Sequence, residues 1–239
     1  MIQESPMQPS LASTALPPDM IDKALSPVQQ AYQYILNGIL SGELTAGMRI
    51  PTESVAEVLG ISRTPVRDAL RRLEGDGAVM ISANRGAAVA KYSRAEVAQL
   101  IEMRAVLEGL AARCALPNIG TVELDELMHL NSKMKLASTS LSTWMAAHDA
   151  FHNYLTSLSR RPLLARQTEK MRLMLLPYYR DYYNQSLEME ILGLEHEKLI
   201  SAIEFKDATH LEQIVRQHAM ANVDKVAILA ESDHDHFKN

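Results

Sequence analysis

The sequence predicts a mainly α-helical protein, with an N-terminal winged helix-turn-helix followed by a C-terminal all-helical antiparallel bundle. Three observations support this fold class. Apolar residues recur at helical spacing along most of the chain. Aromatic residues make up only 5% of the chain and there are 13 Met, which favours helical cores over an all-β sandwich. A single stretch, AVMISANRGAAVAKYS, instead has β-type residues on both sides of an Asn-Arg-Gly turn.

Bulk properties indicate a soluble globular protein. The length, 239 residues, fits one large domain or two ordinary ones, and hydrophobic and charged residues make up 47% and 22% of the chain. No apolar run approaches the roughly 18–20 residues that cross a bilayer, and the N-terminus lacks the pattern of a secretory signal. Cys114 is the only cysteine, so no internal disulfide can form. We therefore expect a cytoplasmic protein with no membrane association.

The first elements alternate between helix and turn. Residues 1–26 are rich in Pro, Ser, Ala and Met and are expected to form a flexible tail. A helix is predicted from Ser26-Pro27 until Gly42 stops it. A turn and a short extended piece then lead to a second helix, which Gly60 closes.

A third helix and a hairpin complete the N-terminal domain. Ser62 is a suitable N-cap for the third helix, Pro65 is tolerable in its first turn, and the helix should end near residues 75–77. The hairpin that follows makes a winged helix-turn-helix domain over residues 27–92.

From Arg94 onward the pattern is helical throughout. Breaks are expected at Pro117, Gly120, Pro162, Pro177 and Lys206-Asp207. We therefore predict a second domain over residues 93–232 and a flexible tail over 233–239. Its helices are predicted at residues 95–116, 121–138, 141–158, 162–180, 187–205 and 207–232.

Charge differs between the two domains. The whole chain carries −5, yet residues 27–92 hold seven Lys and Arg against six acids, whereas residues 93–239 hold sixteen against twenty. The third helix shows why the first domain is basic. Val66, Ala69, Leu70 and Leu73 share one face, and the opposite face has Arg63, Arg67 and Arg71 at i, i+4 and i+8, with Thr64 beside them.

Such an arginine row suits a DNA duplex, because guanidinium groups bind phosphate oxygens or the O6 and N7 atoms of guanine. Arg85 at the tip of the hairpin would reach the backbone or the minor groove. The alternative is a merely solvated helix face; the helix-turn-helix and wing around the row favour DNA. Arg72 faces elsewhere and is expected to pair with Glu74 or Glu57 as a structural residue.

Four histidines of the second domain form a candidate metal site. His148 and His152 are four residues apart on one helix, and His196 and His218 lie on two later helices. Imidazoles from three helices can converge on a divalent ion such as Zn²⁺ or Ni²⁺. The alternative is that they are unrelated histidines. His196-Glu197 begins like a zincin motif, but Ile200 stands where the second His is required, so a metalloprotease is excluded.

The stretch ESVAEVLGISRTPVRDALRRLEGDG resembles the DNA-binding domain of GntR-family transcription regulators, over residues 27–90. The resemblance implies that Arg63, Thr64 and Arg67 contact operator DNA and that Arg85-Gly86 forms the wing contact. Many relatives have a base-reading Arg at the start of the middle helix. Here that stretch is Thr52-Glu53-Ser54.

The second domain resembles the FCD effector-binding domain of the FadR subfamily, in IEMRAVLEGLAARCA, DAFHNYL, EHEKLISAIEFKD and RQHA. Metal-containing members use an Asp and three His. The three His correspond to His152, His196 and His218, while His148 occupies the Asp position. Asp149 is adjacent but is expected to point elsewhere.

The same resemblance places Arg104 where relatives hold the carboxylate of an acidic effector. The alternative for Arg104 is an intrahelical salt bridge with Glu108. Arg172, Tyr178 and Tyr179 are further candidates for this cavity, on helical position alone.

The expected function is therefore that of a non-enzymatic, ligand-responsive transcription regulator. It would bind a palindromic operator as a homodimer, act as a repressor, and sense a small carboxylate metabolite through a metal site. Two alternatives remain open: a metal-dependent enzyme in the bundle, and a DNA-binding protein that needs no ligand.

Overall fold

The computed structural model describes residues 22–137, 140–185 and 189–230 and confirms the mainly α-helical fold class. The contacts divide this part of the chain into two compact units, residues 22–75 with 79–89 and residues 76–78 with 90–230. The division after Val89 falls close to the predicted domain boundary. Most of the predicted N-terminal tail and the predicted C-terminal tail lie outside the described residues.

Three helices build the first unit, and their ends follow local capping chemistry. The Ser26 side chain accepts a hydrogen bond from the Gln29 backbone in a capping box, and Gly42 ends this first helix in the left-handed region with φ 82°. Gly60 closes the second helix in the same way, with φ 65°. The helices are α1 (Pro27–Ser41), α2 (Thr52–Leu59) and α3 (Arg63–Gly75).

A small antiparallel sheet accompanies them. The predicted hairpin is present as β2 (Val79–Ser82) and β3 (Gly86–Val89), with Met80 opposite Ala88. The short extended piece before α2 becomes a third strand, β1 (Arg49–Ile50), giving the order β1-β3-β2. The predicted wing is therefore a three-stranded sheet.

The core of this unit lies between α1 and α3. Val66, Ala69, Leu70 and Leu73 of α3 are all buried, as the sequence predicts. Ala31, Ile35 and Ile39 of α1 are buried as well, and α1 packs mainly on α3. This packing fixes which face of α3 is left for solvent.

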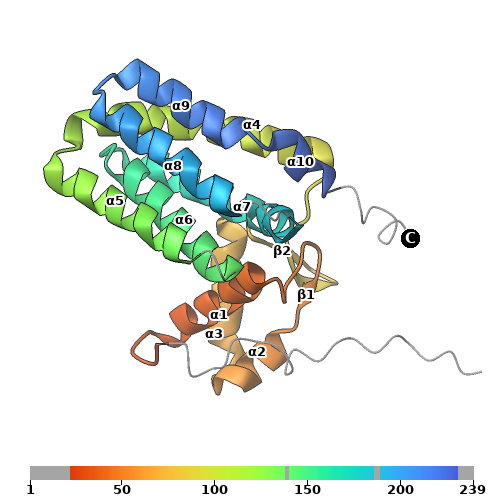
Figure 1. Cartoon of the computed structure of the whole chain (residues 1–239). Coiled ribbons are helices and arrows are strands. Elements are labelled where there is room, and N and C mark those ends of the chain that lie inside the picture. The colour runs from red at the N-terminus through yellow and green to blue at the C-terminus, as the bar shows by residue number, and fades with distance from the viewer. Residues whose placement is uncertain (1–21, 138–139, 186–188, 231–239) are drawn as a thin grey trace, which may run out of the picture. The chain divides into compact units, whose positions relative to one another are not determined.

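The second unit is a helical bundle. Figure 1 shows α4 and α9 side by side, and α5 beside α6, in agreement with the contacts between these helices. Its core includes the fully buried Trp144 and Phe151 of α6. The elements are α4 (Arg94–Ala115), a 3₁₀ turn at Leu116–Asn118, α5 (Thr121–Leu136), α6 (Leu141–Ser157), α7 (Pro162–Gln185), α8 (Met189–Glu204), α9 (Ala208–Met220) and α10 (Val223–Ile228).

The predictions for two helices of the bundle are wrong: one helix is longer than predicted and another is divided in two. Helix α7 continues through Pro177 to Gln185, although proline removes one intrahelical hydrogen bond. Tyr178, Tyr179, Tyr182 and Tyr183 beyond it are all buried, and this packing outweighs the local break. The last predicted helix, 207–232, is instead divided into α9 and α10 at residues 221–222.

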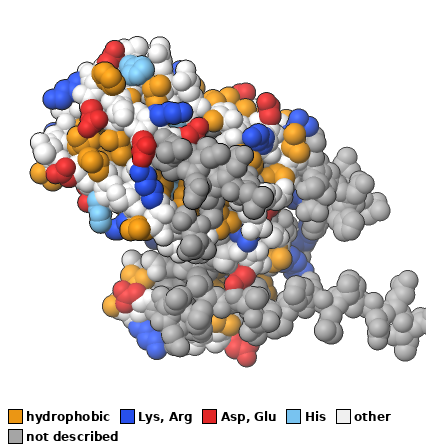
Figure 2. Space-filling view, in the orientation of Figure 1, with side chains coloured by type: hydrophobic (Ala, Val, Ile, Leu, Met, Phe, Trp, Pro, Cys, Tyr) orange, Lys and Arg blue, Asp and Glu red, His pale blue; other side chains and the backbone are white. Residues whose placement is uncertain are grey.

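The surface is mixed in character. On the face of the second unit that Figure 2 shows, acidic, basic and hydrophobic side chains alternate over short distances. Of the helices that the structure describes, none combines the length and apolar character that crossing a bilayer requires.

Candidate functional site

The outer face of α3 holds the arginine row. Arg63, Thr64, Arg67 and Arg71 are exposed, opposite the residues that bury against α1. Arg67 makes no hydrogen bond or ion pair with any other described residue. The helix therefore presents a cationic surface to solvent, with Arg67 unengaged at its centre.

Acidic neighbours engage the two flanking arginines. The Nη1 atom of Arg63 lies 2.7 Å from Oε1 of Glu53, and Nη1 of Arg71 lies 3.5 Å from Oδ1 of Asp68. All four side chains are largely exposed, so these pairs contribute little stability. The stretch where many relatives carry a base-reading Arg thus supplies Glu53, a carboxylate that contacts the arginine row.

The tip of the wing contains a glycine in the left-handed backbone conformation. Gly86 adopts φ 75°, a left-handed conformation that L side chains disfavour, and Arg85 beside it is exposed. Arg49 of β1 is a further exposed cation here, with Nη2 within 3.8 Å of where a Gly86 Cβ would stand. Sequence reasoning missed Arg49, because its proximity to the wing depends on the β1–β3 pairing.

Arg72 has a different partner from the one predicted. Its guanidinium carbon lies 4.5 Å from the ring centroid of Tyr32 on α1, which is a cation–π contact. The predicted pairing of Arg72 with Glu74 or Glu57 is not what the structure shows. Glu74 instead accepts a hydrogen bond from the backbone of Ile81. Arg72 therefore joins α3 to α1, a structural role as expected.

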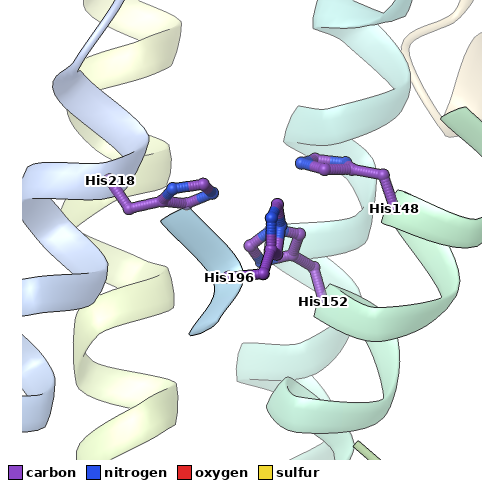
Figure 3. A group of neighbouring side chains, drawn as sticks. All are labelled: His148, His152, His196 and His218. Carbon is purple, nitrogen blue, oxygen red and sulfur yellow. The ribbon is translucent and has the colours of Figure 1, made fainter. Parts of the chain in front are cut away.

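In the bundle, four histidines converge. His148 and His152 project from α6, His196 from α8 and His218 from α9, and their rings point toward one another (Figure 3). One ring nitrogen from each lies within 4.8 Å of the others. The structure thus brings together all four residues that the sequence singles out.

Aromatic neighbours hold His148 in place. Trp144, one turn earlier on α6, stacks on the His148 ring with centroids 5.1 Å apart, and Tyr183 meets Trp144 edge-on at 4.9 Å. Asp149 does not join the four nitrogens, yet its Oδ1 lies 3.9 Å from both Nδ1 of His148 and Nε of Arg172. It is therefore closer to the cluster than expected.

A carboxylate orients His218. Its Nδ1 lies 3.1 Å from Oε2 of Glu195, one residue before His196. The hydrogen bond to His218 lowers the pKa of Glu195, which stays ionised and leaves Nε2 of His218 as the free nitrogen. Nothing in the sequence pattern identified Glu195, since the contact joins two helices.

The buried imidazoles favour the neutral form. Burial lowers the pKa of His148 well below its ordinary value, and the neighbouring His218 and Arg104 lower it further. Burial likewise lowers the pKa of His152, with His148 and His218 adding to the effect. Neutral imidazole is the form that coordinates a metal ion.

Next to the histidines lies a buried charged network. Arg104 donates to the Tyr179 hydroxyl over 3.0 Å and to the carbonyl of Ala219 over 3.2 Å. Its Nε is 4.0 Å from Glu108, but Glu108 is bonded more closely by Arg172, which also bonds Asn153. The predicted intrahelical pair is thus part of a larger network.

Two guanidinium N–H groups of this network lack acceptors. The Nε atoms of Arg104 and Arg172 are buried without a hydrogen-bond partner among the described residues. Of the other two predicted cavity residues, Tyr179 joins the network, while the Tyr178 hydroxyl instead bonds the backbone of Tyr92, whose N–H donates to it over 2.5 Å.

The donor set fits a divalent transition-metal ion. Tetrahedral zinc with Zn–N bonds of about 2.0–2.1 Å places its ligand nitrogens about 3.3 Å apart. The Nε2 atoms of His152 and His196 are already 3.2 Å apart. Imidazole nitrogens suit zinc, nickel or copper rather than magnesium or calcium, which prefer oxygen.

Family models match both units. The model described as bacterial regulatory proteins, gntR family, matches residues 27–89, and the FCD domain model matches residues 99–221. The chain is 36% identical over 89 residues to an uncharacterized HTH-type transcriptional regulator of Mycobacterium tuberculosis (strain ATCC 25618 / H37Rv). That match covers 37% of this chain and only 36% of the length of that protein.

Longer matches agree with these models. The chain is 23% identical to the HTH-type transcriptional repressor RspR of Escherichia coli (strain K12) over 224 residues, covering 91% of this chain and 98% of that one. The solved structure of E. coli McbR/YncC shares the fold with a TM-score of 0.77 and 22% identity, covering 86% of this chain and 99% of that one. The chain therefore belongs to the GntR family of bacterial regulatory proteins, with an FCD domain after its winged helix-turn-helix.

Proposed function

We propose that this regulator binds a palindromic operator as a cytoplasmic homodimer, represses transcription, and responds to a small carboxylate held at the four-histidine cluster. The observation that carries the sensing role is the convergence of His148, His152, His196 and His218 in the bundle core. For the DNA-binding role, the support is the exposed arginine row on α3. The contacts proposed for DNA are Arg63, Thr64, Arg67, Arg71, Arg85 and Gly86.

The histidines would hold zinc or nickel, which when bound supplies a Lewis-acidic position for a carboxylate oxygen. Glu195 keeps His218 in the tautomer that offers Nε2, and Trp144 holds the His148 ring. The four imidazole ligands are neutral, so the ligand set itself cancels none of the charge of the ion, whereas an Asp ligand would cancel one unit of it.

Unsatisfied donors favour an anionic effector. Glu108 and Asp149 lie beside Arg104 and Arg172 and balance their charges, but each arginine has a buried Nε without a hydrogen-bond acceptor among the described residues. A carboxylate there would accept from Arg104, the predicted effector contact. An anion that binds one arrangement of the dimer better than another would shift DNA affinity by no more than that preference.

The nearby carboxylates favour sensing over catalysis. Glu195 is hydrogen-bonded to His218, Glu108 to Arg172, and Asp149 faces Arg172 as well. Each of these three carboxylates is thus engaged by a cationic or imidazole side chain, and none of the three stands free at the cluster as a candidate general base. A hydrolysis or isomerisation assay on metal-loaded protein tests the enzymatic alternative.

Trp144 provides the direct test, because it is the only tryptophan and stacks on His148. Zinc added to metal-free protein should change its fluorescence with a stoichiometry of one per chain. A thermal-shift screen of small carboxylic acids should then find stabilisation that disappears after treatment with a chelator. Zinc binding that leaves Trp144 fluorescence and all acid responses unchanged would refute the proposal.

For the DNA-binding half, an operator selected from a random duplex pool should be palindromic. The acid found in the screen should weaken its binding if the protein is a repressor relieved by effector. A screen in which no small acid alters either stability or operator affinity would instead support a DNA-binding protein that needs no ligand.

A further inference from the structure

A cavity separate from the four nitrogens lies where α6 ends and α7 begins. It is an open hollow with a volume of about 580 Å³. The last turns of α6, the connecting loop and the first two turns of α7 line it. The histidine rings themselves do not line this cavity.

Its lining is cationic. Arg160, Arg161 and Arg166 line it together with one carboxylate, Glu169, and all four side chains are exposed to solvent. No acidic group lies within 4.0 Å of any of the three arginines in the described part of the chain, and none of them makes a side-chain hydrogen bond there. The cavity therefore holds a surplus of two positive charges that no described side chain neutralises.

Other arginines of this unit form ion pairs with carboxylates. Arg113 lies 3.4 Å and Arg216 2.6 Å from the Glu212 carboxylate, and Arg180 lies 3.2 Å from Asp181. Three guanidinium groups without a side-chain partner among the described residues are thus a local feature of the junction between α6 and α7.

The loop backbone holds this arrangement under strain. Arg160 has φ 54°, and only one other described non-glycine residue, Lys206, has a positive φ. The N–H groups of Arg160 and Arg161 donate to the carbonyl of Ser157 over 3.1 Å and to Oγ of Ser159 over 3.2 Å, so the turn is fixed. The left-handed conformation commonly follows the end of a helix, and here it follows α6 and fixes the backbone of Arg160 beside the cavity.

We propose that this cavity binds the phosphate group of a small molecule. Guanidinium groups bind phosphate oxygens in a bidentate fork, and three of them offer enough donors to surround one phosphate. The polar side chains of Asn153 and Thr156 also line the cavity and are less exposed than the three arginines. Asn153 also accepts from Arg172, which bonds Glu108, so the site is linked to the buried network.

The test uses metal-free full-length protein and inorganic pyrophosphate, with sodium chloride at matched ionic strength as reference. Calorimetry should show saturable binding of pyrophosphate, at least tenfold weaker in the Arg161→Gln/Arg166→Gln variant. Glu169→Gln should bind a few-fold more tightly, because it removes the one negative charge. Lys133→Gln, an exposed charge removed from α5, should behave as wild type.

Arg160→Gly separates a binding role from a structural one. Glycine accepts the left-handed backbone, so the Tm of the anion-free protein should rise, while pyrophosphate affinity should fall. A fall in Tm with unchanged affinity would overturn the role of Arg160.

Three other outcomes would overturn the site itself. In the first, chloride gives the same calorimetric signal as pyrophosphate. In the second, the Arg161→Gln/Arg166→Gln variant binds pyrophosphate as tightly as wild type. In the third, His152→Ala loses pyrophosphate binding, which would place the anion at the histidines. Retained pyrophosphate binding in His152→Ala keeps this proposal independent of the metal site. If the double variant instead weakens only binding to duplex DNA and pyrophosphate has no effect, the cavity contacts DNA and binds no small molecule.

Discussion

The Nε2 atoms of His152 on α6 and His196 on α8 lie 3.2 Å apart in the core of the bundle. Both rings are almost fully buried, and His148 and His218 flank them. Only one proton can lie between two neutral imidazole nitrogens, whereas a metal ion can accept both lone pairs. The pair is therefore the centre of the proposed metal site.

Removing either member of this pair should abolish metal uptake. We expect His152→Ala and His196→Ala to lose zinc after gel filtration, when wild type retains about one ion per chain. His129→Ala on α5, an exposed histidine, is the matched control and should retain zinc. Equal metal content in all four proteins would exclude the cluster as the binding site.

Glu195 should affect affinity without being a ligand. Glu195→Gln keeps the size of the side chain but weakens its hold on Nδ1–H of His218, and such changes cost roughly 10–100-fold in metal affinity. Competition with a zinc chelator measures the change. Glu197→Gln, two residues away and paired with Lys135, is the control expected to leave affinity unchanged; a similar loss in both variants would indicate a general effect on α8.

The metal-free protein should lose stability on mild acidification. The pKa of His148 and of His152 is lowered in the folded state, so the unfolded chain binds more protons as the pH falls below about 6.5. The free energy of unfolding, measured with denaturant, should therefore decrease from pH 7.5 to pH 5.5. A His148→Asn/His152→Gln variant should show a flatter dependence, and an equally steep one would contradict this origin.

His218 is positioned by the close packing of α9 on α4, and Gly109 of α4 permits this close packing. A Cβ on Gly109 would lie 2.6 Å from Cγ of Arg216 and 3.1 Å from the carbonyl oxygen of Glu212. Gly109→Ala should lower stability by about 1–3 kcal/mol, despite the better helix propensity of alanine, and weaken zinc binding. Gly75→Ala at the end of α3, where a Cβ meets nothing within 4 Å, is the control expected to keep or slightly raise stability.

Much of the fold could be predicted from local sequence. Gly42 and Gly60 end helices where the left-handed conformation is needed, and the apolar period of α3 identifies its buried face. Pro177 misled the prediction because its local cost is outweighed by the burial of the tyrosines that follow it. A single-sequence pattern contains no information on that packing.

The candidate site was less accessible to sequence reasoning. The i,i+4 spacing of His148 and His152 is local, but bringing His196 and His218 to them requires the tertiary fold, which only the family resemblance supplied. The contacts of Glu195 with His218 and of Arg172 with Glu108 join different helices, and no spacing rule predicts them.

On the DNA-facing surface, Arg67 and Arg71 should behave differently. Arg67→Ala should weaken binding to the selected operator by about 1–3 kcal/mol and relax its sequence preference if Arg67 reads a base. Arg71→Ala should weaken binding to all sequences and reduce the salt slope by about 1 if Arg71 contacts phosphate. Titrations of operator and mutated duplexes at several salt concentrations separate the two roles. Unchanged operator affinity in Arg67→Ala would remove that residue from the interface. Arg72→Ala is the control: it loses the Tyr32 contact, so it should lower stability while leaving sequence preference intact.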